Sequence, residues 1–453
     1  MSSQMRNIHD SQHYNTPASS RFGIRADALT FTADPFYNDP EECIRFIRDA
    51  LIVIADGKIE SAGPCPADRD LMPENTVSYP GKLLMPGLID CHCHYVQTPM
   101  IGSYGDTLLS WLNQYTFPTE QHFSDPAVAA DTARVFFDQI LSQGTTTAAV
   151  FATTYPVSAD AFFAESERRG TRMICGKVLQ DRNLPEGLRD KSARQSVEES
   201  EELLLRWHGR GRQLYAVVPR FAPTSTDLQL TLAGELYQKY LDRGVYMHTH
   251  LGESDEEIAW VHDLFPDAES YTDVYRRFGL LGPRSIMAHC CVMKPGEWQL
   301  LSESGAAAVH CPASNLFLGD AQFRWWEAKD PLRPVKTGMG TDVGGGTSFS
   351  IVRNLGEAYK VGMLGGHSLS AFRAFYLATR GGAEALGLAD RIGSIEPGME
   401  ADLCVLDLDL PFVSWRLDRA RTLEEKLFCL QTLAPDNLVE ATYVAGRCVY
   451  SKS

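Results

Sequence analysis

Short apolar stretches alternate with amphipathic ones through the middle of the chain. The amphipathic stretches have helical spacing, and the one after Asp227 repeats apolar residues at steps of four, namely Leu228, Leu232, Leu236 and Tyr240. Eight stretches of strand length follow one another between residues 83 and 346: LLMPGLIDCHCHY, GTTTAAVFATT, RMICGKVLQD, LYAVVPRFAPT, GVYMHTHLGE, SIMAHC, AAAVHCPASN and KTGMGTDVGGG. Strands that alternate with helices in this way are typical of a (β/α)8 TIM barrel, so we expect an α/β fold of that type.

A doubly wound parallel sheet is the alternative that the same alternation leaves open. Such a sheet usually carries a glycine-rich phosphate-binding turn after its first strand. Here the first predicted strand is followed by His92 and His94 and not by a glycine-rich turn, which favours the barrel.

Both ends of the chain read as strands. Near the N-terminus, LIVIADGKIESAG places Asp56-Gly57 between two apolar runs, which predicts a hairpin. GSIEPGMEADLCVLDLD and ATYVAGRCVYSKS near the C-terminus have the same character, so we expect the two ends to build one small β-sandwich domain. The expected organisation is a flexible tail (1–20), the N-terminal part of the small β domain (21–84), the barrel (85–394) and the C-terminal part of the β domain (395–453).

Composition and charge exclude several classes of protein. Hydrophobic residues make up 44% of the 453 residues and charged residues 22%, so the chain can bury a large core. A formal charge of −16 argues against binding nucleic acid or a membrane surface, since both require basic patches. Eleven cysteines without disulfide spacing, no apolar run of about 18 residues and no secretory signal indicate a soluble, cytoplasmic protein with free thiols.

Histidines and carboxylates close several of the predicted barrel strands. Catalytic groups of such barrels lie at the C-terminal ends of the strands. Residues two apart in a strand share a face, so His92 and His94 are expected to project together. The other polar residues at or just after strand ends are His248, His250, Glu253, His289, His310, Thr341 and Asp342.

Imidazoles that converge with a carboxylate form a metal site. Neutral imidazole nitrogen and carboxylate oxygen suit zinc or iron, and a position left unfilled would hold water. The spacing His-x-His is a weak signal by itself. Its conjunction with a histidine and an aspartate at later strand ends makes it strong, whereas the alternative of separate buried, hydrogen-bonded polar groups accounts poorly for the whole set.

The segments around these histidines resemble the amidohydrolase superfamily. The resemblance rests on PGLIDCHCHYVQTPMIGSYGDTLLSWLNQYTFPTE, PRFAPTS, HTHLGE, AHC, CPASNLFLG and GMGTDVGGGTSFS, and it covers roughly residues 80 to 400. Gln97 and the segment WLNQYTFPTE are similar to the guanine deaminase branch in particular. The resemblance therefore implies a zinc-dependent hydrolysis of guanine to xanthine and ammonia.

The same resemblance implies which residues carry the reaction. It implies one zinc ion per chain, held by His92, His94, His250 and Asp342. It places Gln97, Arg220 and Phe221 around a small purine base. It also implies that Glu253 and His289 act beside the metal, and relatives of this kind tend to be homodimers.

The expected mechanism assigns a task to each polar group. Asp342 ligates the metal and accepts the proton of the attacking water, while His289 orients that water. Glu253 protonates the ring nitrogen beside the carbon under attack. Arg220 can donate to O6 and N7 of guanine, and Gln97 can meet the remaining amide edge. For Arg220, an ordinary ion pair with a neighbouring loop is the alternative.

Two departures from the family pattern bear on the metal. Cys91 and Cys93 stand where relatives more often have Thr and Ile or Val. By strand alternation both thiols face away from the histidines, so we interpret them as packing residues, with a Cys/His cluster as the alternative. Two-metal members bridge their ions with a lysine on the fourth strand; LYAVVPRFAPT has none and Lys177 lies one strand earlier, which favours one metal.

Other function classes lack their sequence signatures. The His-x-Glu and Pro-Cys-x-x-Cys motifs of other nucleobase deaminases are absent, as is the Gly-x-Ser-x-Gly motif of serine hydrolases. Two alternatives stay open: a deaminase of a related heterocycle (an oxidised purine, a pterin or a triazine) and an inactive scaffold relative. A scaffold would have no need to keep the full set His92, His94, His250, Glu253, His289 and Asp342.

Overall fold

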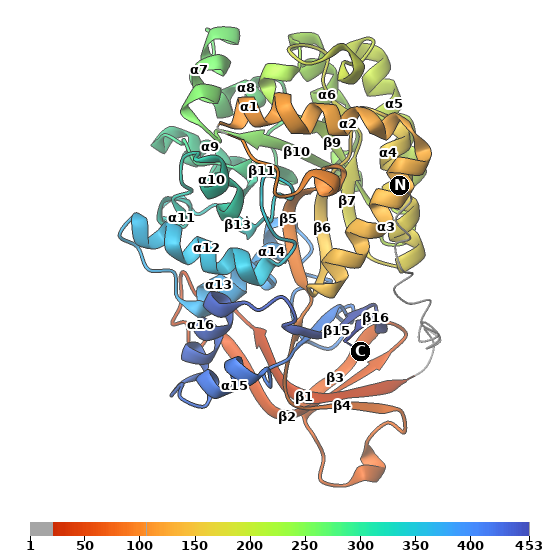
Figure 1. Ribbon diagram of the computed structural model, residues 1–453, viewed down its shortest axis with the longest axis vertical. Helices are drawn as coiled ribbons and strands as arrows, with labels where there is room; N and C mark the ends of the chain where they lie inside the picture. The colour runs from red at the N-terminus through yellow and green to blue at the C-terminus, as the bar shows by residue number, and fades with distance from the viewer. Residues whose placement is uncertain (1–20, 106, 453) are drawn as a thin grey trace.

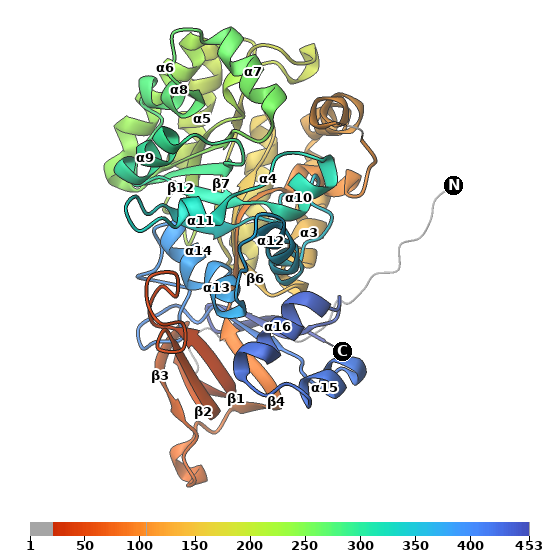
Figure 2. The ribbon, with the colours of Figure 1, turned by 90° about the vertical axis from the view of Figure 1, so that its left-hand side faces the viewer.

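The molecule has two parts, a barrel with its helices and a β-rich part built from both chain ends. The computed structural model describes residues 21–105 and 107–452. Figure 1 shows the barrel above the strands of the chain ends, and the view turned by 90° shows the same arrangement (Figure 2). The expected flexible tail, residues 1–20, lies outside the described residues.

Eight parallel strands form the barrel, one from each of the eight apolar stretches. They are β5 (Leu88–His94), β6 (Thr145–Phe151), β7 (Arg172–Gly176), β9 (Leu214–Pro219), β10 (Tyr246–Leu251), β11 (Ser285–His289), β12 (Ala307–His310) and β13 (Lys336–Met339). Hydrogen bonds join them in chain order, and the short β8 (Val178–Leu179) follows β7 and also pairs with β9. The predicted α/β barrel fold is confirmed.

Backbone hydrogen bonds connect the segment after β13 to β5, the first strand of the barrel. The N–H of Asp342 donates to the carbonyl oxygen of His92 at 2.9 Å, and the N–H of His94 donates to that of Val343 at 2.8 Å. Asp342 is thereby fixed beside both histidines of β5 by the main chain alone.

Helices follow the strands and cover the barrel (Figure 1). They are α1 (Leu108–Trp111), α2 (Phe117–Gln121), α3 (Pro126–Ser142), α4 (Pro156–Arg169), α5 (Ala193–Trp207), α6 (Asp227–Tyr240), α7 (Asp255–Leu264), α8 (Tyr271–Arg277), α9 (Pro295–Ser304), α10 (Pro312–Leu318), α11 (Trp325–Ala328), α12 (Ile351–Leu364), α13 (Ala371–Leu377) and α14 (Arg380–Ala385). Short turns of 3-10 helix, such as η2 (Tyr95–Met100) and η5 (Glu186–Leu188), and the π-helical η3 (Leu112–Thr116) connect them. Across the described part of the chain, no helix is both long and apolar enough to cross a membrane.

Helix α6 forms where apolar residues at steps of four predicted a helix, and its buried face includes Leu236 and Tyr240 but not Leu228. Leu228 is 54% exposed, and the buried side chains are those of Gln229, Leu230, Ala233, Leu236, Tyr237 and Tyr240. With 3.6 residues per turn, residues four apart are offset by about 40° around the helix axis. A series of such steps therefore drifts away from the face that meets the barrel.

The two chain ends share one seven-stranded mixed sheet, with the order β16-β15-β14-β4-β1-β2-β3. Its strands are β1 (Phe22–Phe31), β2 (Ile44–Ala55), β3 (Lys58–Pro64), β4 (Thr76–Pro86), β14 (Leu403–Leu406), β15 (Val439–Val444) and β16 (Arg447–Ser451), and α15 (Pro411–Leu417) and α16 (Leu423–Leu433) lie between β14 and β15 in sequence. The predicted hairpin is confirmed, because Asp56 and Gly57, both with positive φ, connect β2 to β3. β4 pairs with β14, which joins the ends, and continues along the chain toward β5.

Candidate metal centre and active site

The polar residues that close the barrel strands converge at one end of the barrel. His92 and His94 lie near the end of β5 on the same face of the strand. His250 lies near the end of β10, and Asp342 follows β13. Asp342 and His289 have φ values of 47° and 75°, a conformation that persists where surrounding structure enforces it, as it does at many functional sites.

Four side-chain atoms approach one another closely enough to share one ion. Nε2 of His94 lies 3.3 Å from Nε2 of His92 and 3.2 Å from Nε2 of His250. Oδ1 of Asp342 lies 3.2 Å from Nε2 of His92 and 3.3 Å from Nε2 of His94. Ligands about 2.0–2.1 Å from a tetrahedral ion are about 3.3–3.4 Å apart, so these separations fit a small metal ion.

The protonation of these four residues also suits a cation. Burial lowers the pKa of His92 and His94 and holds the pKa of His250 well below its usual value, so the rings are neutral at pH 7. Burial opposes the charge of Asp342, but His92 and His94 hold the pKa of its carboxyl well below the usual range. Neutral imidazoles and an ionised carboxylate are the forms that bind metals.

Hydrogen bonds at Nδ1 orient two of the imidazoles whose Nε2 atoms face the predicted metal position. Nδ1 of His92 lies 2.8 Å from Nε2 of His248, and Nδ1 of His250 lies 2.7 Å from the carbonyl oxygen of Arg220. When Nδ1 donates to these acceptors, Nε2 of each ring keeps its lone pair for a metal. His248 therefore acts on the site through His92, a role that its place at a strand end did not reveal.

Glu253 and His289 lie next to each other beside the predicted metal ligands. Nδ1 of His289 lies 3.4 Å from Oε1 of Glu253, and its Nε2 lies 3.9 Å from Oδ2 of Asp342. Burial, helped by the carboxylates of Asp320 and Asp342, raises the pKa of Glu253 well above its usual range. Burial lowers the pKa of His289 to about 4. Glu253 therefore holds a proton more readily than an ordinary glutamic acid, while the ring of His289 is neutral at pH 7.

A pocket lies over these groups. Gln97, Arg220 and Phe221, the three residues predicted to surround a base, all line it, together with Glu253. The predicted ligands His94, His250 and Asp342 line it too, and Leu108, Trp111 and Leu112 contribute apolar surface. The structure therefore brings three of the four predicted metal ligands and all three predicted base-binding residues to one cavity.

Arg220 makes an ion pair and lines the pocket at the same time. Its Nη1 donates to Oε2 of Glu120 at 2.8 Å and to Oε1 at 3.1 Å, and both side chains are buried. The carboxylate also accepts from Nε2 of Gln97 at 3.2 Å, while Oε1 of Gln97 accepts from the N–H of Gly344 at 3.1 Å. Arg220 thus forms an ion pair, as one interpretation expected, and lines the pocket, as the other expected.

Sequence reasoning missed Glu120 and Asn315. Glu120 lies in the segment WLNQYTFPTE, and Asn315 lies in CPASNLFLG on α10, where its Nδ2 is 3.2 Å from Nδ1 of His289. Both residues lie in segments that resemble the family. A polar residue within such a segment was the available signal in the sequence.

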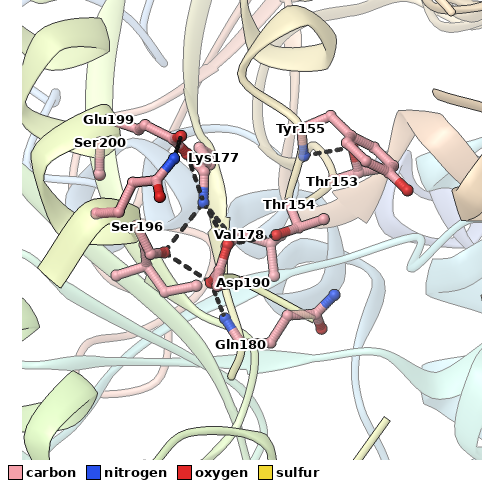
Figure 3. A network of polar contacts seen from close by, with 12 residues as sticks. Thr153, Thr154, Tyr155, Lys177, Val178, Gln180, Asp190, Ser196, Glu199 and Ser200 are labelled. Carbon is pink, nitrogen blue, oxygen red and sulfur yellow. Dashed lines mark hydrogen bonds and ion pairs between the residues drawn. The ribbon is translucent and has the colours of Figure 1, made fainter. Parts of the chain in front are cut away.

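Lys177 belongs to a network of polar contacts that contains none of the predicted metal ligands among its labelled residues (Figure 3). Its Nζ donates to Oδ1 of Asp190 at 2.8 Å and to Oγ of Ser196 at 3.0 Å. Asp190 further accepts from the hydroxyl of Thr154 and the N–H of Gln180. With Lys177 committed to Asp190, no lysine is among the side chains that line the pocket.

His310, Cys91 and Cys93 stay outside the metal centre. The His310 ring stacks on Phe323 with centroids 4.7 Å apart, and burial lowers its pKa to about 3. Cys91 and Cys93 are buried in apolar clusters. Within the described residues, the groups able to hold a metal draw only on His92, His94, His250, His289 and Asp342.

A barrel with these ligands at the carboxyl ends of its strands defines a metal-dependent hydrolase. The chain belongs to the amidohydrolase family, whose sequence model, described as Amidohydrolase family, matches residues 83–449. Within the family, guanine deaminases are among the proteins to which it is similar. It is 45% identical to guanine deaminase of Escherichia coli (strain K12) over 425 residues, which are 92% of this chain and 95% of that relative.

Solved structures agree with this placement. The structure of E. coli guanine deaminase superposes with a TM-score of 0.91 at 42% identity and covers 96% of this chain and 100% of that chain. Guanine deaminase from Bradyrhizobium japonicum gives 0.92 at 34% identity, with coverages of 96% and 100%. The enzyme from C. acetobutylicum, solved with guanine bound in its active site, gives 0.84 at 27% identity, with coverages of 95% and 100%.

Proposed function

We propose that this chain hydrolyses guanine to xanthine and ammonia. The observation that carries the proposal is one pocket lined by three of the proposed metal ligands, by the carboxyl of Glu253, and by Arg220 beside the aromatic Phe221. Similarity to guanine deaminases over nearly the whole chain supports it.

We propose zinc as the metal, one ion per chain, with His92, His94, His250 and Asp342 as its ligands. The ligand types and their separations support this choice. When bound, zinc lowers the pKa of a water molecule toward about 7 and so supplies a nucleophile near neutral pH.

The chain's own groups then move the protons. Oδ2 of Asp342 faces His289, so this oxygen can accept a proton from water while Oδ1 faces His92 and His94. Glu253, whose pKa burial raises, donates a proton to the ring nitrogen next to the carbon that is attacked. Neutral His289 lies between the two carboxyl groups and orients the water.

The same pocket explains the choice of guanine. The guanidinium of Arg220 has only donors, and guanine offers O6 and N7 as acceptors. Adenine carries an amino group in place of O6, which would oppose a donor with a donor. Phe221 contributes an aromatic face, and Gln97 lies next to Arg220 through their shared contact with Glu120.

Turnover of guanine by zinc-loaded protein, followed by ultraviolet absorbance, tests the proposal. We expect conversion to xanthine with one zinc ion per chain by elemental analysis. Protein that holds one zinc ion and leaves guanine unchanged, while it deaminates another amino-bearing heterocycle, would contradict the assignment of guanine. A homodimer is proposed as well, and light scattering of the purified protein tests it.

A further inference from the structure

Glu120 is a fully buried carboxylate that reaches two of the proposed base-binding residues. It lies on α2, in the continuous helical segment Leu108–Gln121 that also provides Leu108, Trp111 and Leu112 to the pocket. Its side chain has 0% exposed surface and does not line the pocket itself. Any influence of Glu120 on a bound base therefore passes through its neighbours.

The contacts of Glu120 fix which donors Arg220 can offer. Both carboxylate oxygens accept from Nη1, which carries two of the five N–H groups of a guanidinium. The other three N–H groups, on Nε and Nη2, make no hydrogen bond to the described residues. The guanidinium also lies over the ring of Phe117, with its carbon 5.6 Å from the centroid. Nη1 of Arg220 is thus bound to Glu120, and the N–H groups of Nε and Nη2 are available to a ligand in the pocket.

Glu120 also fixes the amide of Gln97. Nε2 donates to Glu120, and Oε1 accepts from the backbone N–H of Gly344, which determines the direction in which the amide points. The carboxylate thus connects a residue after β5 with one after β9 and holds both in a single orientation.

We propose that Glu120 is a positioning residue that makes the pocket selective for bases with an oxygen acceptor at C6. This inference rests on the proposed function and adds to it the origin of its specificity. Without the negative charge, Arg220 is free to turn its donors elsewhere, and a 6-oxo group loses its fixed partner. A purine that lacks this oxygen keeps only the contact through N7, so the change should weaken its binding less.

Two ligands that are not deaminated isolate the contact. Hypoxanthine carries the 6-oxo group and purine does not, and neither has the 2-amino group that leaves in the proposed reaction. Dissociation constants measured by calorimetry on the zinc-loaded protein and on Glu120→Gln are compared. We expect the substitution to weaken hypoxanthine binding at least tenfold and purine binding less than threefold, with zinc content unchanged. The KM for guanine should rise in parallel, and kcat should change less.

Further variants separate positioning from general damage. Glu165→Gln, which alters an ion pair with Arg169 outside the pocket, is the matched control and should leave both dissociation constants unchanged. If Glu120→Gln does not fold, Arg220→Lys keeps a charge beside Glu120 but loses the fork, and it should lose the preference for hypoxanthine. Glu120→Asp should retain part of that preference.

Distinct results overturn the inference and the proposed function. Equal weakening of both ligands in Glu120→Gln, or unchanged binding of both, would contradict a positioning role for Glu120. So would an Arg220→Lys protein that prefers hypoxanthine as strongly as the parent does. The proposed function fails separately, if the parent protein binds these ligands but leaves guanine unchanged.

Discussion

Nδ1 of His92 lies 2.8 Å from Nε2 of His248, with both rings completely buried. Burial holds the pKa of His248 well below its usual value, so its ring is neutral and its Nε2 can accept a hydrogen bond from Nδ1–H of His92. His92 thereby presents Nε2, the atom nearest Oδ1 of Asp342, with a free lone pair. The geometry of the predicted metal site thus depends on a residue that is not one of the proposed ligands.

Replacing His248 by Ala should weaken zinc binding. Loss of a partner that orients a metal ligand typically costs about 10- to 100-fold in metal affinity. Competition with a chelator of known affinity measures the change. His310→Ala is the matched control, since His310 is also a buried histidine of a barrel strand but packs on Phe323. Equal losses in the two variants would show that removing any buried histidine has this effect.

Replacing Glu253 by Gln should separate catalysis from metal binding. The amide cannot give up a proton as the carboxyl does, so kcat for guanine should fall by about 10² to 10⁴, the usual contribution of a general acid. Zinc content should stay at one ion per chain, since Glu253 is not among the four proposed ligands. Glu256→Gln, an exposed position in the first turn of α7, should keep full activity. Loss of the metal together with activity in Glu253→Gln would assign Glu253 to the metal.

Replacing Lys177 by Met should lower the stability of the fold. The substitution leaves Asp190 buried without its ammonium partner, and breaking one half of a buried ion pair costs about 3–5 kcal/mol. Denaturant unfolding measures the loss. Lys239→Met removes an exposed ion pair with Glu201 and should change stability far less. A lysine ligating a metal would instead lower the zinc content, which we expect to be unchanged in Lys177→Met.

Local sequence pattern predicted the parts of the site that depend on local geometry. Strand alternation places His92 and His94 on one face of β5, whatever surrounds them. The same local signal could not distinguish His250, which meets His94, from His310, which packs on Phe323. That difference is decided by contacts between strands and loops.

Long-range pairing explains what the sequence could not predict. Arg220 and Glu120 are 100 residues apart, and their ion pair exists because the helical segment before α3 folds over the end of β9. The face that α6 buries likewise depends on the barrel against which it packs, so Leu228 lies at the surface despite its spacing. Such contacts become visible only when the elements have been placed in space.

Glu257 should make stability fall as the pH rises. Its carboxyl is fully buried beside the pocket and accepts from the N–H of Glu253 at 2.7 Å and from the hydroxyl of Tyr271 at 2.9 Å. Burial raises its pKa from 4.5 to about 7. Between these values the folded protein holds a proton that the unfolded chain releases, so the free energy of unfolding decreases with pH by up to about 3 kcal/mol. Below about pH 4.5 both states are protonated and the effect disappears.

Glu257→Gln removes this titration while keeping a side chain of the same shape. The amide oxygen and nitrogen can still bond to the neighbours of Glu257, so the variant should lie close to the parent in stability at pH 5. Between pH 5 and pH 8 the parent loses stability and the variant does not. At pH 8 the free energy of unfolding of the variant should therefore exceed that of the parent by up to about 3 kcal/mol more than at pH 5. Denaturant unfolding from pH 5 to 8 measures the gap, with exposed Glu235→Gln as the control whose gap stays constant. A gap for Glu257→Gln that is equally flat would mean that Glu257 is ionised in the folded protein throughout this range.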